Sequence, residues 1–76
     1  MSGNGITNHI RRLRFERGEM TQQALAERIG VTRQTVNAIE ANKYSPSLEI
    51  AFRIANVFAV PLEQVFQYGE APSKNK

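Results

Sequence analysis

The stretch QQALAERIGVTRQTVNAIEA, residues 22–41, decides how this chain folds. Apolar side chains recur through it at the three- and four-residue spacing of two short helices, with Gly30 between them. Gly30 can adopt the left-handed conformation that ends a helix without a steric penalty. Thr21 and Thr32 stand just before the two helical patterns, where a hydroxyl oxygen can accept a hydrogen bond from an unpaired backbone N–H. We therefore predict two capped helices joined by a short turn.

The predicted turn is so short that the Thr32 cap follows Gly30 by only two residues. The two helices therefore cannot lie antiparallel and must cross steeply, and the small side chain of Ala26 keeps the crossing close. This is a helix-turn-helix, an arrangement in which the second helix can be offered to the major groove of DNA. The sequence thus predicts a DNA-binding motif over about residues 22–41.

A longer stretch, TQQALAERIGVTRQTVNAIEANKYSPSLEIA at residues 21–51, resembles the helix-turn-helix of the phage Cro and cI repressor class, the XRE family. The continuation PLEQVFQY at residues 61–68 is similar to the small stand-alone regulators of the cytolysin-repressor type. The resemblance covers residues 6–68 and implies an all-α, five-helix domain like that of lambda repressor, with a short terminal β ribbon in the closer relatives. Residues 1–5 and 69–76 are expected to be a flexible start and a mobile tail.

Length and charge are compatible with a small DNA-binding domain. At 76 residues a single core gives only marginal stability, so pairing of subunits would help, and no cysteine is present to form a disulfide. Ten Lys and Arg against seven Asp and Glu give a net charge of +3. The excess lies within residues 1–45, where a polyanion would bind, although charge alone fits an ordinary solvated surface equally well.

The residue types that support catalysis are scarce. His9 is the single histidine, Asp and Cys are absent, and no Gly-rich phosphate loop is visible. We expect no enzyme activity, no cofactor, no metal and no small-molecule ligand. The first residues, MSGNGITN, do not resemble a signal peptide, and no apolar run approaches a membrane span, so we expect a cytoplasmic protein without a membrane partner.

Further helices are predicted on both sides of the motif. A first helix is expected from about Thr7 to Arg17. Its buried stripe is formed by apolar residues at helical spacing, Ile6, Ile10 and Leu13. Phe15 points away from this stripe, where the resemblance implies a polar residue. It is expected either to cover a neighbouring side chain or to meet a partner.

A fourth helix, LEIAFRIANVF at residues 48–58, is apolar nearly all round and is expected to begin after a Ser47 cap. Its core-facing residues are predicted to be Leu48, Ala51, Ile54, Ala55 and Phe58. Pro61 is expected to start a short fifth helix over Leu62 to Phe66. The apolar residues of the fourth helix that the core does not need suggest a homodimer interface. The resemblance implies that the end of the chain contributes to the same interface. Its predicted members are Ile50, Ile54, Val57, Phe66 and Tyr68.

The second motif helix is expected to read DNA with the face opposite Val36 and Ile39. Arg can donate to guanine, Gln can pair with adenine, and an Ala methyl can contact that of thymine. A helical wheel and the resemblance together give the predicted base contacts, which are Thr32, Arg33, Gln34, Asn37 and Ala38.

Other polar residues are expected to bind phosphates or to hold the scaffold. The predicted phosphate contacts are Gln22, Asn42, Lys43, Tyr44 and, less directly, Arg11. The resemblance implies a buried or half-buried ion pair between Arg14 and Glu40, which would tie the first helix to the end of the second motif helix.

These predictions together describe a sequence-specific regulator of transcription, a repressor on the family pattern, that binds a palindromic operator in double-stranded DNA as a homodimer. A rival hypothesis is an antitoxin-like interaction module that masks a partner protein through Phe15 or the outer face of residues 48–58. A third is nonspecific DNA binding with equal affinity for all sequences.

Overall fold

Hydroxyl side chains start the three helices that build the centre of the fold. In the computed structural model, which describes residues 5–69, α2 (Gln22–Ile29), α3 (Arg33–Glu40) and α4 (Leu48–Phe58) each begin at such a cap. Thr21 Oγ1 accepts a hydrogen bond from Ala24 N at 2.9 Å, and Thr32 and Ser47 do the same for the next two helices. Gly30 ends α2 in the left-handed conformation, with φ at 81°. The predicted caps and turn are confirmed.

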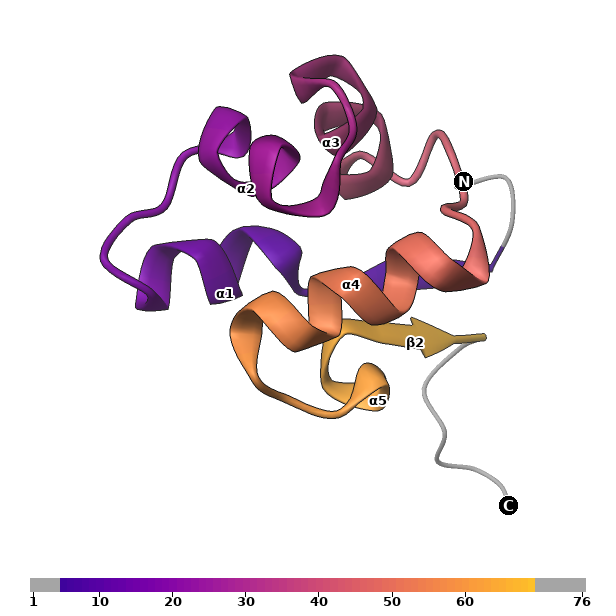
Figure 1. Cartoon of the computed structure of the whole chain (residues 1–76). Helices are drawn as coiled ribbons and strands as arrows, with labels where there is room; N and C mark the ends of the chain where they lie inside the picture. The colour runs from indigo at the N-terminus through magenta and orange to yellow at the C-terminus, as the bar shows by residue number, and fades with distance from the viewer. Residues whose placement is uncertain (1–4, 70–76) are drawn as a thin grey trace.

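The remaining elements pack beneath this motif. They are β1 (Ile6–Asn8), α1 (Ile10–Glu16), α5 (Leu62–Val65) and β2 (Phe66–Tyr68). Figure 1 shows α2 and α3 together on one side of the molecule, α1 and α4 beneath them, and α5 with β2 on the far side. The predicted fold is confirmed, because the described residues form five helices and a short two-stranded antiparallel ribbon.

The core draws on all five helices. Its buried apolar side chains are Ile10, Leu13, Leu25, Ala26, Ile29, Val36, Ile39, Ala51, Ile54, Ala55, Phe58 and Val65. No polar or charged residue among residues 5–69 is buried. Ala26 is fully buried where α2 packs on α3 and α4, as its small size predicted.

The chain before α1 differs from the prediction. Helix α1 begins at Ile10 rather than near Thr7, because Ile6–Asn8 forms β1 and pairs antiparallel with β2. Asn8 Oδ1 also accepts a hydrogen bond from Ile10 N at 3.1 Å, which fixes the start of the helix. At the other end Phe66 belongs to β2, so α5 is shorter than predicted. Residues 1–4 and 70–76 of the expected flexible ends lie outside the described part.

Two predictions for α4 are wrong. Leu48 was expected in the core but is 68% exposed, because the core-facing stripe of α4 starts at Ala51. Ile54 was expected in a dimer interface but is only 1% exposed, so it has no surface to offer a second subunit. Ile50 and Val57 are half-buried against the core, while Phe52 is 49% exposed.

Candidate nucleic-acid interface

Helix α3 has one face in the core and one in solvent. Val36 and Ile39 are buried, and this anchors the inner face. The structure brings the predicted base-contacting residues to the outer face and the start of the helix. Thr32, Arg33, Gln34 and Asn37 are exposed there, and Ala38 is half-buried. The Thr32 hydroxyl is also engaged locally, since it caps the helix and lies 2.9 Å from the Thr35 hydroxyl.

An ion pair fixes the C-terminal end of α3 to α1. Arg14 Nε donates to Glu40 Oε2 at 2.6 Å, and Arg14 Nη2 donates to Glu40 Oε1 at 3.1 Å. A third donor, Arg14 Nη1, binds the carbonyl of Met20 at 2.8 Å. The two side chains are only 15% and 10% exposed, so this bidentate pair is shielded from solvent. The ion pair implied by the resemblance is therefore present, and it orients the loop before α2 as well.

Gln22 connects this ion pair to the outer face of α3. Its amide nitrogen donates to Glu40 Oε1 at 3.1 Å and lies 3.4 Å from Asn37 Oδ1. The sequence predicted that this amide would donate to a phosphate. In the structure its two N–H groups are directed within the protein, so the part of Gln22 best suited to a phosphate is its backbone N–H at the start of α2.

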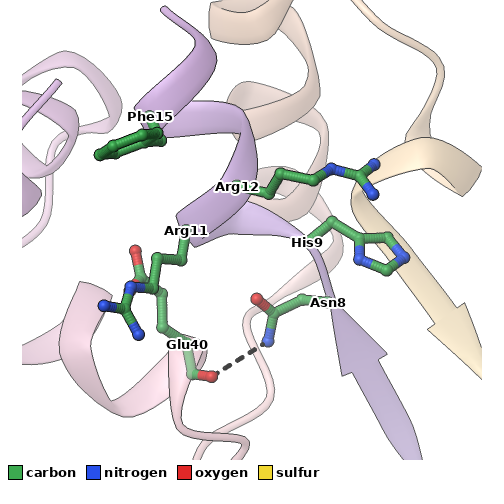
Figure 2. A pocket seen from close by; sticks show the side chains of 6 residues that line it. All are labelled: Asn8, His9, Arg11, Arg12, Phe15 and Glu40. Carbon is green, nitrogen blue, oxygen red and sulfur yellow. Dashed lines mark hydrogen bonds between the residues drawn. The ribbon is translucent and has the colours of Figure 1, made fainter. Parts of the chain in front are cut away.

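Asn8 holds the same end of α3 from the opposite direction. Its Nδ2 donates to the carbonyl of Ile39 and to Asn42 Oδ1, both at 3.0 Å, and lies 3.4 Å from the carbonyl of Glu40. Figure 2 shows this side chain reaching from the end of β1 toward Glu40. Sequence reasoning missed this contact. The only local signal was an Asn placed two residues before a helical pattern.

The basic side chains of residues 5–69 differ in what they contact. Arg14, Arg17 and Arg53 each donate to a main-chain carbonyl at a helix end or loop, respectively those of Met20, Phe58 and Ile29. These three side chains act as scaffold. Within residues 5–69 four other basic side chains form no ion pair: Arg11, Arg28, Arg33 and Lys43.

Two shallow hollows lie on the surface that α2 and α3 share. One is lined by Arg14, Thr21, Gln22, Gln23 and Arg33, and the other by Arg11, Arg14, Gln22, Asn37, Glu40 and Ala41. The first contains the N-terminus of α2, where unpaired N–H groups and the helix dipole favour an anion. Lys43 and Tyr44 follow α3 and are exposed, whereas Asn42 is half-buried with φ at 61°.

Comparison with known proteins agrees with this geometry. Residues 10–65 match the helix-turn-helix family HTH_3. The chain belongs to the Cro/cI-type helix-turn-helix family. An uncharacterized HTH-type transcriptional regulator from Methanothermobacter thermautotrophicus is 48% identical over 66 residues, which are 86% of this chain and 94% of that protein. Another, from Methanocaldococcus jannaschii, is 53% identical over 49 residues, 64% of this chain and 74% of that protein.

A solved structure gives the same result. The crystal structure of "a putative DNA-binding protein from Bacteroides fragilis" superposes with a TM-score of 0.70 at 26% identity, covering 82% of this chain and 98% of that one. The present chain is thus a transcription regulator with a helix-turn-helix DNA-binding domain. Both of the relatives described above are named as transcriptional regulators.

No cluster of three or more metal-ligating side chains occurs within residues 5–69. None of the helices in that range is long and apolar enough to cross a membrane. A further hollow on the α1 side is lined by Asn8, His9, Arg11, Arg12, Phe15 and Glu40. Figure 2 shows Phe15 and Arg11 extending to one side of α1 and Arg12 and His9 to the other.

Proposed function

We propose that this regulator represses transcription by binding a palindromic operator as a homodimer, with the outer face of α3 in the major groove. The observation that carries the proposal is the exposure of Arg33, Gln34 and Asn37 on a helix whose opposite face is buried. Three polar side chains on a firmly anchored surface match the requirements for reading base edges. Thr32 and Ala38 flank them and complete the reading face.

Phosphate contacts on either side of α3 would set its register. On one side the N-terminus of α2 and the guanidinium of Arg33 share a hollow that suits an anion. On the other side Lys43 and Tyr44 are exposed just beyond the helix, with Asn42 beside them. Arg11 lines the second hollow and would approach the backbone from α1. These contacts contribute affinity but carry no sequence information.

A homodimer would supply the second reading helix. Exposed apolar side chains on α4 and β2, namely Leu48, Phe52 and Tyr68, are available for pairing, with half-buried Ile50, Val57 and Phe66 beside them. Two α3 helices in successive major grooves require half-sites about 34 Å apart, one helical turn of DNA. A dimer bound across a promoter would exclude the polymerase, and this is the proposed route to repression.

Selection of bound duplexes from a random pool tests this proposal. We expect enrichment of two inverted half-sites whose centres are separated by about one helical turn. Footprinting of polymerase on a promoter that carries the selected site should then show exclusion by the regulator. A pool without an enriched sequence would contradict sequence-specific binding, and a single unpaired half-site would contradict the dimer.

An antitoxin-like protein-binding role is the second candidate, favoured by the 68% exposure of Phe15 on α1. A large aromatic side chain on a surface with Arg11, Arg12 and His9 suits an acidic partner protein. Light scattering on the pure protein separates the two candidates. A stable dimer supports operator binding, whereas a monomer that also fails to select DNA supports the masking role.

A further inference from the structure

The side chain of Glu40 fixes the orientation of a neighbouring amide. Both carboxylate oxygens of Glu40 accept hydrogen bonds from Arg14, at 2.6 and 3.1 Å, and Oε1 also accepts from Gln22 at 3.1 Å. An ionised carboxylate can only accept hydrogen bonds. The nitrogen of the Gln22 amide, and not its carbonyl oxygen, must therefore face Glu40.

The same nitrogen carries a second N–H group, which faces Asn37, one turn before Glu40 on α3. Gln22 Nε2 lies 3.4 Å from Asn37 Oδ1. The carbonyl oxygen of Asn37 faces this N–H group, so that it can accept the hydrogen bond. Rotating the Asn37 amide by half a turn would place two NH2 groups against each other, with no acceptor between them. The NH2 group of Asn37 is thereby left at the exposed face of α3.

We infer that Gln22 is a positioning residue that sets the hydrogen-bonding polarity of Asn37, so that Asn37 selects a base that offers acceptors, guanine or thymine. Guanine presents O6 and N7 in the major groove, and thymine presents O4. With its oxygen turned toward Gln22, Asn37 presents only its NH2 group at the exposed face, whereas the two-bond contact with adenine needs the oxygen and the NH2 group together at that face. The inference rests on the proposed function, since it concerns how the same surface reads DNA.

The chain of contacts crosses three helices. It runs from Arg14 on α1 to Glu40 on α3, returns to Gln22 on α2, and ends at Asn37 on α3. Its first link is the shielded ion pair, which holds Glu40 in place. Base preference at one operator position therefore depends on a residue that does not itself contact the base.

Selection from a random duplex pool with the full chain tests the inference. The position read by Asn37 is identified as the one whose preference disappears in Asn37→Ala. There the wild type should prefer guanine or thymine over adenine by about tenfold, the effect of one well-placed hydrogen bond. Asn37→Asp, which only accepts, should move the preference to adenine or cytosine. Gln22→Met, which keeps the length of the side chain and removes the donor, should admit adenine at that position alone.

Gln64→Met is the matched control, because Gln64 is an exposed glutamine on α5, on the far side of the molecule from α2 and α3. It should leave every preference unchanged, and thermal unfolding should show that all variants remain folded. Selection of adenine by the wild type at the Asn37 position overturns the inference and leaves the proposed function intact. An unchanged preference in Gln22→Met overturns it as well. A pool with no enriched sequence overturns both.

Discussion

Arg33 stands at the first position of α3 with its side chain exposed and without an ion-pair partner among residues 5–69. Arg14, by comparison, donates hydrogen bonds to Glu40 and to the carbonyl of Met20. Two arginines of one small domain thus have opposite uses, one available to a ligand and one committed to the fold. Substitution of each should separate DNA binding from stability.

Replacing Arg33 with Ala should weaken binding to the selected operator by about 1–3 kcal/mol and relax preference at one base position, because a base-contacting Arg discriminates through its paired donors. Fluorescence anisotropy titrations on the operator and on random DNA measure both effects. Lys43→Ala is the comparison, since a phosphate contact should weaken both DNAs alike and flatten the salt dependence. Equal losses on both DNAs in Arg33→Ala would make Arg33 a phosphate contact instead.

Replacing Arg14 with Met should lower the free energy of unfolding by about 3 kcal/mol, because the shielded Glu40 carboxylate loses its charged partner. Urea denaturation measures the change. The double variant Arg14→Met with Glu40→Met should recover much of the loss, since no unpaired charge remains. A single variant as stable as the wild type would mean that solvent reaches Glu40 freely.

At the scale of the elements, most helix boundaries could be predicted because they depend on nearby residues. Thr21, Thr32 and Ser47 cap the helices that follow them, and Gly30 ends α2, all through contacts within a few positions. The resemblance implied a short ribbon, but the position of β1 could not be predicted, because its partner β2 lies at the other end of the described chain. Pairing with β2 gives Ile6–Asn8 a strand conformation that the helical spacing of Ile6, Ile10 and Leu13 concealed.

The candidate site shows the same division. The periodicity of α3 was sufficient to predict which side chains are exposed, because Val36 and Ile39 leave only one inner face. The orientation of α4 was harder to predict, since apolar residues surround it: Leu48 was wrongly placed in the core, and Ile54, correctly placed there, was also wrongly assigned to the dimer interface. The contacts of Gln22 and Asn8 with α3 are long-range polar contacts, and no local pattern indicates them.

The C-terminus of α4 offers a gain in stability. Ala59 caps it in the left-handed conformation, with φ at 57°, which costs a residue with a Cβ about 1–2 kcal/mol. Ala59→Gly should therefore raise the free energy of unfolding by about 0.5–1 kcal/mol after the greater flexibility of unfolded Gly is included. Ala41→Gly, at a helix end with φ at −83°, should lower it. Thermal and urea unfolding of the two variants measure the change in the free energy of unfolding. A decrease in both variants would contradict a strained Ala59.

At the scale of the whole molecule, large apolar side chains remain exposed on two helices, α4 and α1, besides Tyr44 and Tyr68. Phe52 and Leu48 lie on α4, and Phe15 lies on α1. A dimer needs one such surface, and the remaining one is then available to a different partner. Two phenylalanines on different helices make the surfaces distinguishable by the same substitution.

Phe52→Lys should shift the protein from dimer to monomer, because a charge would enter the proposed apolar contact, and operator affinity should fall with the loss of the second half-site contact. Sedimentation velocity and anisotropy titrations measure the two effects. Phe15→Lys is the matched control and should remain dimeric. A monomer from Phe15→Lys with an intact dimer from Phe52→Lys would move the interface to α1.

Asn8 belongs to the two-stranded ribbon, and its side chain also donates hydrogen bonds to the carbonyl of Ile39 and to Asn42 at the end of α3. Asn8 therefore links three segments. It pairs with β2 at the other end of the described chain, and it also contacts the end of α3, the helix proposed to touch DNA. A change that separates β1 from β2 should therefore also weaken the contact of the Asn8 amide with the end of α3.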